Sequence, residues 1–323
     1  MNRVAVLMMA YGGPNTLDDV EPYLLDVRGG RPTSPEFVEE IRERYARIGG
    51  GSPLLNITVA QAQALEASLN NGHARQPGRA GGPNDVDYRV YVGMRHWYPY
   101  IREAVSHIFQ DGIWQVVAFC MAPHYSKMST DVYFQKLAEA VKELGAQPNL
   151  VPVPDWHANP LFIKALAGQV RAGLAKFAPA ERDSVKIIFS AHSLPAVILD
   201  RGDPYPDELA ETCRLLAAEL GLTDQRWQFA YQSAGASGGR WLGPAIEDSI
   251  KDLCRAGTRN ILVAPVGFVA DHVEILFDLD VECRELAQSC GAHLERTESL
   301  NTSPAFIAAL ADIVRTSTRR LAK

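Results

Sequence analysis

NILVAPVGFVADHVEILFDLDVECREL, residues 260–286, joins a buried strand to a helix and carries an unusual row of acids. Its first part, residues 260–266, is a short apolar and β-branched run, which predicts a buried strand that ends around residues 265–267. A helix is predicted to begin near Asp271, with Asp271 as its cap. A buried strand followed directly by such a helix is the repeating unit of a parallel α/β sheet.

Seven other apolar runs of the same kind alternate with longer amphipathic stretches. They lie at residues 4–9, 88–93, 116–121, 150–153, 185–190, 228–232 and 293–295. Each half of the chain therefore holds four candidate strands, which predicts two similar doubly wound α/β domains. The expected domains are residues 1–156 and 157–302. A closing helix over residues 303–322 is expected to pack back on the first domain.

Composition excludes several classes of protein. The 323 residues carry a formal charge of −6, without the surplus of Lys and Arg that nucleic-acid binding needs. No run reaches eighteen apolar residues, and the one before Tyr11 is too short for a signal-peptide core. The five cysteines form no CxxC pair, which disfavours a disulfide framework. We expect a cytoplasmic protein with no transmembrane segment, reduced thiols and no nucleic-acid partner.

The acids of the opening stretch form a row along the predicted helix. Glu274, Asp278 and Glu282 recur at every fourth residue, which places three carboxylates on one helix face. Like charges at this spacing are mildly destabilising, so the row needs an explanation. It is either a solvated acidic face or, because most intervening residues are apolar, a path for a hydrated divalent cation.

Histidines follow several of the predicted strands, where open α/β sheets bind their ligands. His192 comes directly after the fifth strand and could be purely structural. Paired with Glu274 from the same edge, it could instead bind a transition metal or accept a proton. His272 is interpreted as structural, because two residues from Glu274 it would lie on another helix face. His124 and His96 are further candidates for the same cleft.

The first fifty residues offer groups suited to a flat, anionic ligand. Arginines bind carboxylates through paired hydrogen bonds, and the turn GGGSP at residues 49–53 exposes backbone amides and Ser52. Most surface arginines are only solvated, which remains the alternative. The basic and aromatic residues of this region include Tyr11, Arg28, Arg31, Arg42, Arg44, Tyr45 and Arg47.

Eight segments, in order along nearly the whole chain, resemble motifs of the ferrochelatase family. They are MAYGGP (9–14), RYARIGGGSPL (44–54), YVGMRHWYP (91–99), APHYS (122–126), FSAHSLP (189–195), GDPYP (202–206), WLGP (241–244) and PVGFVADHVEILFDLD (265–280). The resemblance implies two Rossmann-like domains, each a four-stranded parallel sheet flanked by helices, with a porphyrin in the cleft between them. The implied enzyme is a lyase of haem biosynthesis that inserts Fe²⁺ into the porphyrin.

The resemblance also implies roles for individual residues. His192 and Glu274 would be catalytic and bind the iron. Asp278 and Glu282, near Arg44, would form an outer metal site that could bind Mg²⁺. Tyr11 would approach the metal from the opposite side of the ring. The porphyrin and its propionates would be held by Tyr11, Arg28, Arg44, Tyr45, Ser52 and Tyr125.

The closest resemblance is to the coproporphyrin III ferrochelatases of monoderm bacteria, which implies coproporphyrin III as the porphyrin. The alternatives are a protoporphyrin IX ferrochelatase, a cobalt chelatase and a non-catalytic haem or metal carrier. We expect no tightly bound cofactor, and no [2Fe-2S] cluster because no cysteine follows Cys290. The expected protein is a monomer whose partners are its porphyrin, Fe²⁺ and, transiently, neighbouring enzymes of the haem pathway.

Overall fold

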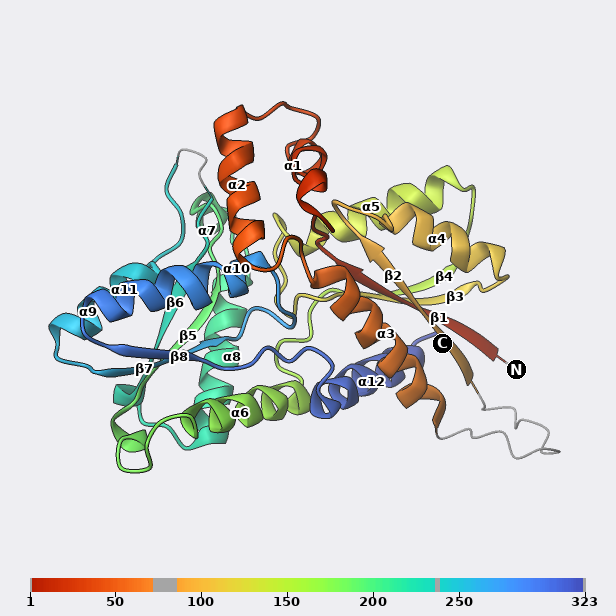
Figure 1. Ribbon diagram of the computed structural model, residues 1–323. Helices are drawn as coiled ribbons and strands as arrows, with labels where there is room; N and C mark the ends of the chain where they lie inside the picture. The colour runs from red at the N-terminus through yellow and green to blue at the C-terminus, as the bar shows by residue number, and fades with distance from the viewer. Residues whose placement is uncertain (1, 72–85, 236–238, 322–323) are drawn as a thin grey trace.

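Eight parallel strands form two four-stranded sheets in this computed structural model, which describes residues 2–71, 86–235 and 239–321 (Figure 1). The first sheet contains β1 (Asn2–Ala10), β2 (Val86–Met94), β3 (Gln115–Cys120) and β4 (Asn149–Val153). The second contains β5 (Lys186–His192), β6 (Trp227–Gln232), β7 (Asn260–Pro265) and β8 (His293–Arg296). The eight predicted strands and the two-domain Rossmann-like fold class are confirmed.

Helices cover both faces of each sheet (Figure 1). In chain order, the helices of the described residues begin with α1 (Val20–Val27), α2 (Pro35–Arg47), α3 (Leu54–Asn70), α4 (Ile101–Gln110) and α5 (Thr130–Glu143). They continue with α6 (Pro160–Leu174), α7 (Val197–Asp200), α8 (Tyr205–Leu220), α9 (Ile246–Arg255), α10 (Val273–Leu276), α11 (Arg284–Ser289) and α12 (Pro304–Thr318). A π-helix, Asp278–Cys283, lies between α10 and α11.

The alternation of β1 shows how one strand serves two cores. Val4, Val6 and Met8 point into a cluster shared with α3, α6 and α12, and the residues between them pack against α4 and α5. Both sets are apolar because a parallel strand covered on both faces has no solvent side. This explains why the strand reads as a continuous hydrophobic run.

The largest core joins the two sheets. It contains Val6 of β1, Phe189 of β5 and Leu262 of β7, all fully buried. The predicted closing helix is α12, which lies between α3 and α6 (Figure 1). The guanidinium of Arg315 on α12 donates to the Ser68 carbonyl of α3. Residue 322 of the predicted helix lies outside the described residues, and the domain limits at residues 156 and 302 stay predictions.

The helix after β7 starts later than predicted and is not a uniform α-helix. Its first residue is Val273, and the π-helix follows one residue after α10. A π-helix holds one more residue per hydrogen-bonded turn than an α-helix, and such segments occur often at functional sites. Among the described residues, no helix is both long and apolar enough to cross a bilayer.

Candidate active site

A cavity of about 480 Å³ lies where the carboxyl ends of both sheets meet. Residues that directly follow or end five of the strands line it, as is usual for ligand sites in open α/β sheets. Gly267 shows how tightly this edge is built, because a Cβ there would lie 2.6 Å from the Cβ of Ala191. The lining residues that end or follow strands include Tyr11, Arg95, His124, His192, Ser233, Gly267 and Glu274.

His192 and Glu274 meet at the wall of this cavity, as predicted. Nδ1 of His192 lies 3.0 Å from Oε2 of Glu274, and each side chain is about one-third exposed, at 32% and 31%. The two groups therefore form a close electrostatic pair. An imidazole nitrogen beside a carboxylate can bind a transition metal or accept a proton.

The environment pulls the pKa values of the two groups apart. Burial would lower the pKa of His192, but the interactions with Glu274, together with the charge of Asp278, outweigh it and raise that pKa above its ordinary value. Burial would raise the pKa of Glu274, yet His192 and His272 hold it well below its usual range. The pair is therefore an ionised carboxylate next to an imidazole that is protonated more readily than usual.

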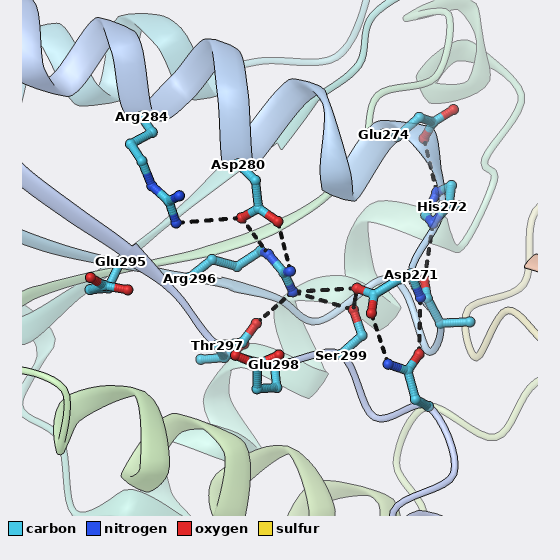
Figure 2. Close-up of polar contacts among 12 residues, drawn as sticks. Asp271, His272, Glu274, Asp280, Arg284, Glu295, Arg296, Thr297, Glu298 and Ser299 are labelled. Atoms are coloured by element: carbon cyan, nitrogen blue, oxygen red, sulfur yellow. Dashed lines mark hydrogen bonds and ion pairs between the residues drawn. The ribbon is translucent and has the colours of Figure 1, made fainter. Parts of the chain in front are cut away.

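His272 belongs to this site, so its interpretation as a structural residue is wrong. It precedes α10 in extended backbone, where the helix-face argument does not apply. Its Nδ1 lies 3.0 Å from the Ala270 carbonyl, and its Nε2 faces Glu274 Oε2 at 3.7 Å (Figure 2). If Nδ1 donates to the carbonyl, Nε2 of the neutral ring offers its lone pair to the cavity.

Asp271 is not the predicted helix cap. Its carboxylate accepts hydrogen bonds from Ser299 at 2.6 Å and from Asn301 at 2.8 Å, and it lies 3.5 Å from Nη1 of Arg296 (Figure 2). Arg296 is 7% exposed and also forms two 2.8 Å bonds to Asp280 of the π-helix. One buried guanidinium thus ties the turn before Glu274 to the helix after it, a connection between distant segments that local sequence patterns do not reveal.

Polar residues behind the pair hold the backbone of both partners. The buried amide of Gln232 donates to the Glu274 carbonyl at 2.8 Å and accepts from Ser190 at 2.8 Å. The Tyr205 hydroxyl donates to the His192 carbonyl at 2.9 Å. These hydrogen bonds fix the backbone of His192 and Glu274, and so the positions from which the two side chains extend, as a preorganised site requires.

Only part of the predicted row of acids lies near the His192–Glu274 pair. Asp278 accepts a hydrogen bond from Ser233, a non-glycine residue at φ 58°, and lies 3.7 Å from Nη1 of Arg44. Burial raises the pKa of Asp278 to about 6, and the charges of Glu274 and Glu282 act in the same direction. Glu282 is exposed. The three acids therefore run from the buried site to the surface across α10 and the π-helix.

The residues predicted to hold the porphyrin divide into two groups. Tyr11, Tyr45 and Ser52 line the cavity, and burial raises the pKa of Tyr11 to about 12. Arg28 and Tyr125 are not among the cavity-lining residues. Arg28 is exposed at the end of α1, and the Tyr125 backbone amide donates to Glu208 on α8. Arg44 also does not line the cavity, and its Nη1 lies 3.7 Å from Asp278. The roles of all six residues stay predictions.

Arg95 is a cavity residue that our sequence reasoning missed. Its guanidinium lies over the rings of Tyr11 at 5.8 Å and Tyr133 at 5.4 Å, and its Nε is buried without a hydrogen-bond partner. Its place directly after β2 could have singled it out. Of the two further histidines, His124 lines the cavity, whereas His96 lies behind Tyr11 with Nδ1 2.7 Å from Asp26.

Comparison with known proteins finds similarity to ferrochelatases over almost the whole chain. A profile described as ferrochelatase matches residues 3–318. The chain is 43% identical to a ferrochelatase of Deinococcus radiodurans, over 96% of this chain and 95% of the relative. It is 40% identical to a coproporphyrin III ferrochelatase of Geobacillus kaustophilus, over 96% and 94%.

A solved structure of SirB from Bacillus subtilis with Fe³⁺ has the same fold, with a TM-score of 0.58 at 10% identity, covering 98% of this chain and 96% of that one. With the family profile spanning both sheets and relatives aligned over almost their full length, the chain belongs to the ferrochelatase family.

Proposed function

We propose that this ferrochelatase inserts Fe²⁺ into coproporphyrin III, with His192 and Glu274 at the point of insertion. The observation that carries the proposal is the 3.0 Å pair of these two residues at the wall of a cavity. The porphyrin is the finer part of the proposal. The Geobacillus kaustophilus relative named for coproporphyrin III supports it, while the Deinococcus radiodurans relative is named only as a ferrochelatase.

The pair provides what metal insertion requires of a protein. Two pyrrole N–H protons must leave the ring as the metal forms bonds to all four nitrogens, so a base must stand beside the metal. The Glu274 carboxylate keeps a negative charge against the incoming cation, and His192 supplies a lone pair when neutral. His272, 3.7 Å from Glu274, gives the released protons a second acceptor.

The cavity offers suitable groups for the ring and its acids. Tyr11 and Tyr45 supply aromatic surface for a flat macrocycle, and Tyr11 would face the metal from the side opposite His192. Arg95 brings a cation to the cavity wall, where it would attract a substrate carboxylate. The four propionates of coproporphyrin III, against two in protoporphyrin IX, suit the arginine supply of the first half of the chain.

The remaining parts of the proposal concern the setting of the reaction. We propose that the enzyme, formally a lyase, works as a cytoplasmic monomer without a resident cofactor or [2Fe-2S] cluster. Its product would pass to a neighbouring enzyme of haem biosynthesis. Asp278 and Glu282 would take up the hydrated metal, Mg²⁺ or incoming Fe²⁺, before it reaches Glu274.

Anaerobic insertion of Fe²⁺ into coproporphyrin III and protoporphyrin IX, followed by loss of porphyrin fluorescence, tests the proposal. We expect a higher kcat/KM with coproporphyrin III, and insertion that is about 10²–10⁴-fold slower with His192→Ala. A preference for protoporphyrin IX would keep the reaction and overturn the substrate. Insertion into neither porphyrin would overturn the proposal.

A further inference from the structure

A second cluster of metal-ligating side chains lies outside the active-site pair, at the crossing from the first sheet to the second. Asp155 and His157 follow β4, and Glu208 lies on α8. One ligand atom from each residue lies within 4.8 Å of the other two. His157 Nδ1 is 3.5 Å from Oδ1 of Asp155 and 3.3 Å from Oε2 of Glu208.

These separations match the edges of a tetrahedral metal site. A Zn²⁺ ion with ligand bonds of about 2.0–2.1 Å holds its ligand atoms about 3.3–3.4 Å apart. The nitrogen lies at about that spacing from both carboxylate oxygens, and a fourth position would be open to water. Asp155 is 44% exposed, which gives an ion access from solvent, while Glu208 is 14% exposed.

The imidazole of His157 is arranged as a ligand would be. The side chain is only 9% exposed, yet Nδ1 is buried with no hydrogen-bond partner and faces both carboxylates. A buried, unsatisfied nitrogen is costly unless something occupies the space in front of it. On the other side of the ring, Nε2 lies 3.2 Å from Oε2 of Glu211. A carboxylate that accepts from the far nitrogen is the usual support of a metal-bound histidine.

The carboxylate of Glu208 is also placed as a ligand would be. Its side chain is 14% exposed, and its Oε2 accepts a 2.6 Å hydrogen bond from the Tyr125 amide, which fixes this oxygen 3.3 Å from Nδ1 of His157. The cluster therefore combines a fixed, largely buried carboxylate with an unpaired nitrogen beside it, and one divalent ion would bind both.

We propose that Asp155, His157 and Glu208 bind a divalent transition metal of the Zn²⁺ type, separate from the iron that is the substrate. The ion would tie the segment after β4 to α8 and so fix one half of the molecule against the other. His157 stacks on His124, with ring centroids 5.7 Å apart, and His124 lines the active-site cavity. The proposed site thus lies directly behind one wall of that cavity, and it does not depend on which porphyrin is used.

Anaerobic titration with Co²⁺, which absorbs visible light far more strongly in tetrahedral than in octahedral coordination, tests the site. The titration is done in the full-length His192→Ala variant, so that the active-site pair does not contribute. We expect one equivalent of Co²⁺ with tetrahedral absorption, displaced by Zn²⁺. Adding His157→Ala should abolish the band, and adding Glu211→Gln should weaken binding about 10- to 100-fold.

His293 provides the matched control, because its Nε2 lies 3.0 Å from Glu295 at an exposed position far from the cluster. His293→Ala should leave the band and its affinity unchanged. Glu211 is 47% exposed, so Glu211→Gln gives a result even if His157→Ala fails to fold. The absence of a tetrahedral Co²⁺ band in the His192→Ala protein would overturn the site. So would an unchanged band and an unchanged Co²⁺ affinity after adding His157→Ala or Glu211→Gln.

Discussion

In the proposed mechanism, the protonation of His192 decides when the His192–Glu274 pair can accept a metal ion. Its ring faces Glu274, with the charge of Asp278 beyond it and His272 on the other side of Glu274. These carboxylates raise its pKa, so the imidazole stays protonated to a higher pH than a free histidine. The pair therefore stabilises the folded state most fully below about pH 6.5, and this contribution is lost as pH rises through the folded pKa.

Glu274→Gln should lower the pKa of His192. The substitution removes the carboxylate that favours the protonated ring, and burial then favours the neutral ring. Metal insertion by the wild-type enzyme should rise with pH as His192 loses its proton. NMR titration of the histidine ring nitrogens measures the shift directly. Glu285→Gln, at an exposed acid paired with Arg47, is the control and should leave the titration in place. An unchanged His192 pKa in Glu274→Gln would show that the two groups are not coupled.

His192→Ala should reduce Fe²⁺ insertion by about 10²–10⁴-fold, the usual effect of losing a group that takes protons at the reacting centre. Porphyrin binding should persist, because Tyr11 and Tyr45 still line the cavity. Turnover and porphyrin fluorescence quenching separate the two effects. His107→Ala, at an exposed position of α4, should match the wild type in both measurements. Near-normal turnover in His192→Ala would rule out the assigned role.

At this scale the sequence predicted that His192 and Glu274 would meet, but not their neighbours. His192 was singled out because it ends a buried strand, and Glu274 because it opens a row of acids on the helix after another strand of the same sheet. His272 was misjudged because a helix was assumed to begin before it, whereas the helix starts at Val273. Arg95 was overlooked because a single arginine after a strand is recognised only when the rings that surround it are known.

The π-helix is the element that joins the reacting pair to the surface. It carries Asp278 and Glu282, and Arg44 of α2 lies against it, with its guanidinium 5.1 Å from the Phe277 ring centroid. The four-residue spacing of the acids fits an α-helix and a π-helix almost equally well. The two helix types differ in their backbone hydrogen bonds, such as the 3.1 Å bond from the Glu282 amide to the Phe277 carbonyl, which no side-chain pattern reveals. The sequence therefore predicted a helix but not its type.

Asp278→Asn should raise the KM for Fe²⁺ and leave kcat and the KM for porphyrin close to wild type. The carboxylate would be lost from the path to Glu274 while the reacting pair remains in place. Because burial raises the pKa of Asp278 to about 6, the wild-type KM for iron should also increase as pH falls through that value. Steady-state kinetics with varied Fe²⁺ test both statements. Unchanged iron dependence in the variant would exclude Asp278 from the path.

Arg296→Ala should lower the free energy of unfolding by about 3–5 kcal/mol, since it leaves Asp280 and Asp271 without their buried cation. Catalysis should fall as well, because the turn before Glu274 loses its tie to the π-helix. Arg284→Ala is the matched control, since this 42% exposed side chain lies 3.8 Å from the same Asp280 and should contribute about 0–1 kcal/mol. Urea denaturation and kcat measure the effects, and equal losses in the two variants would contradict the argument.

Across the whole molecule, the two halves repeat one topology without a recognisable sequence repeat. The strand orders β2-β1-β3-β4 and β6-β5-β7-β8 correspond position for position. Each half could be predicted, because the alternation of strands and helices is written locally in the sequence. The core that unites them could not, since no periodicity indicates that Val6, Phe189 and Leu310 lie in one cluster.

That shared core predicts that the chain unfolds in a single transition rather than domain by domain. Leu310 on α12 is fully buried in it, so Leu310→Ala should cost about 2–5 kcal/mol and should destabilise both sheets together. Leu215→Ala, at a leucine that is 37% exposed on α8, is the control and should have a much smaller effect.

Denaturation followed by tryptophan fluorescence and by far-UV circular dichroism should give coincident curves for the wild type and both variants. Each half contains tryptophans, among them Trp156 after β4 and Trp227 at the start of β6, so the fluorescence reports on both. If Leu310→Ala separated the unfolding into two steps, the halves would be independent domains that touch rather than one cooperative structure. A single shifted step would mean that the cavity between the sheets is held in place by the same packing that keeps the chain folded.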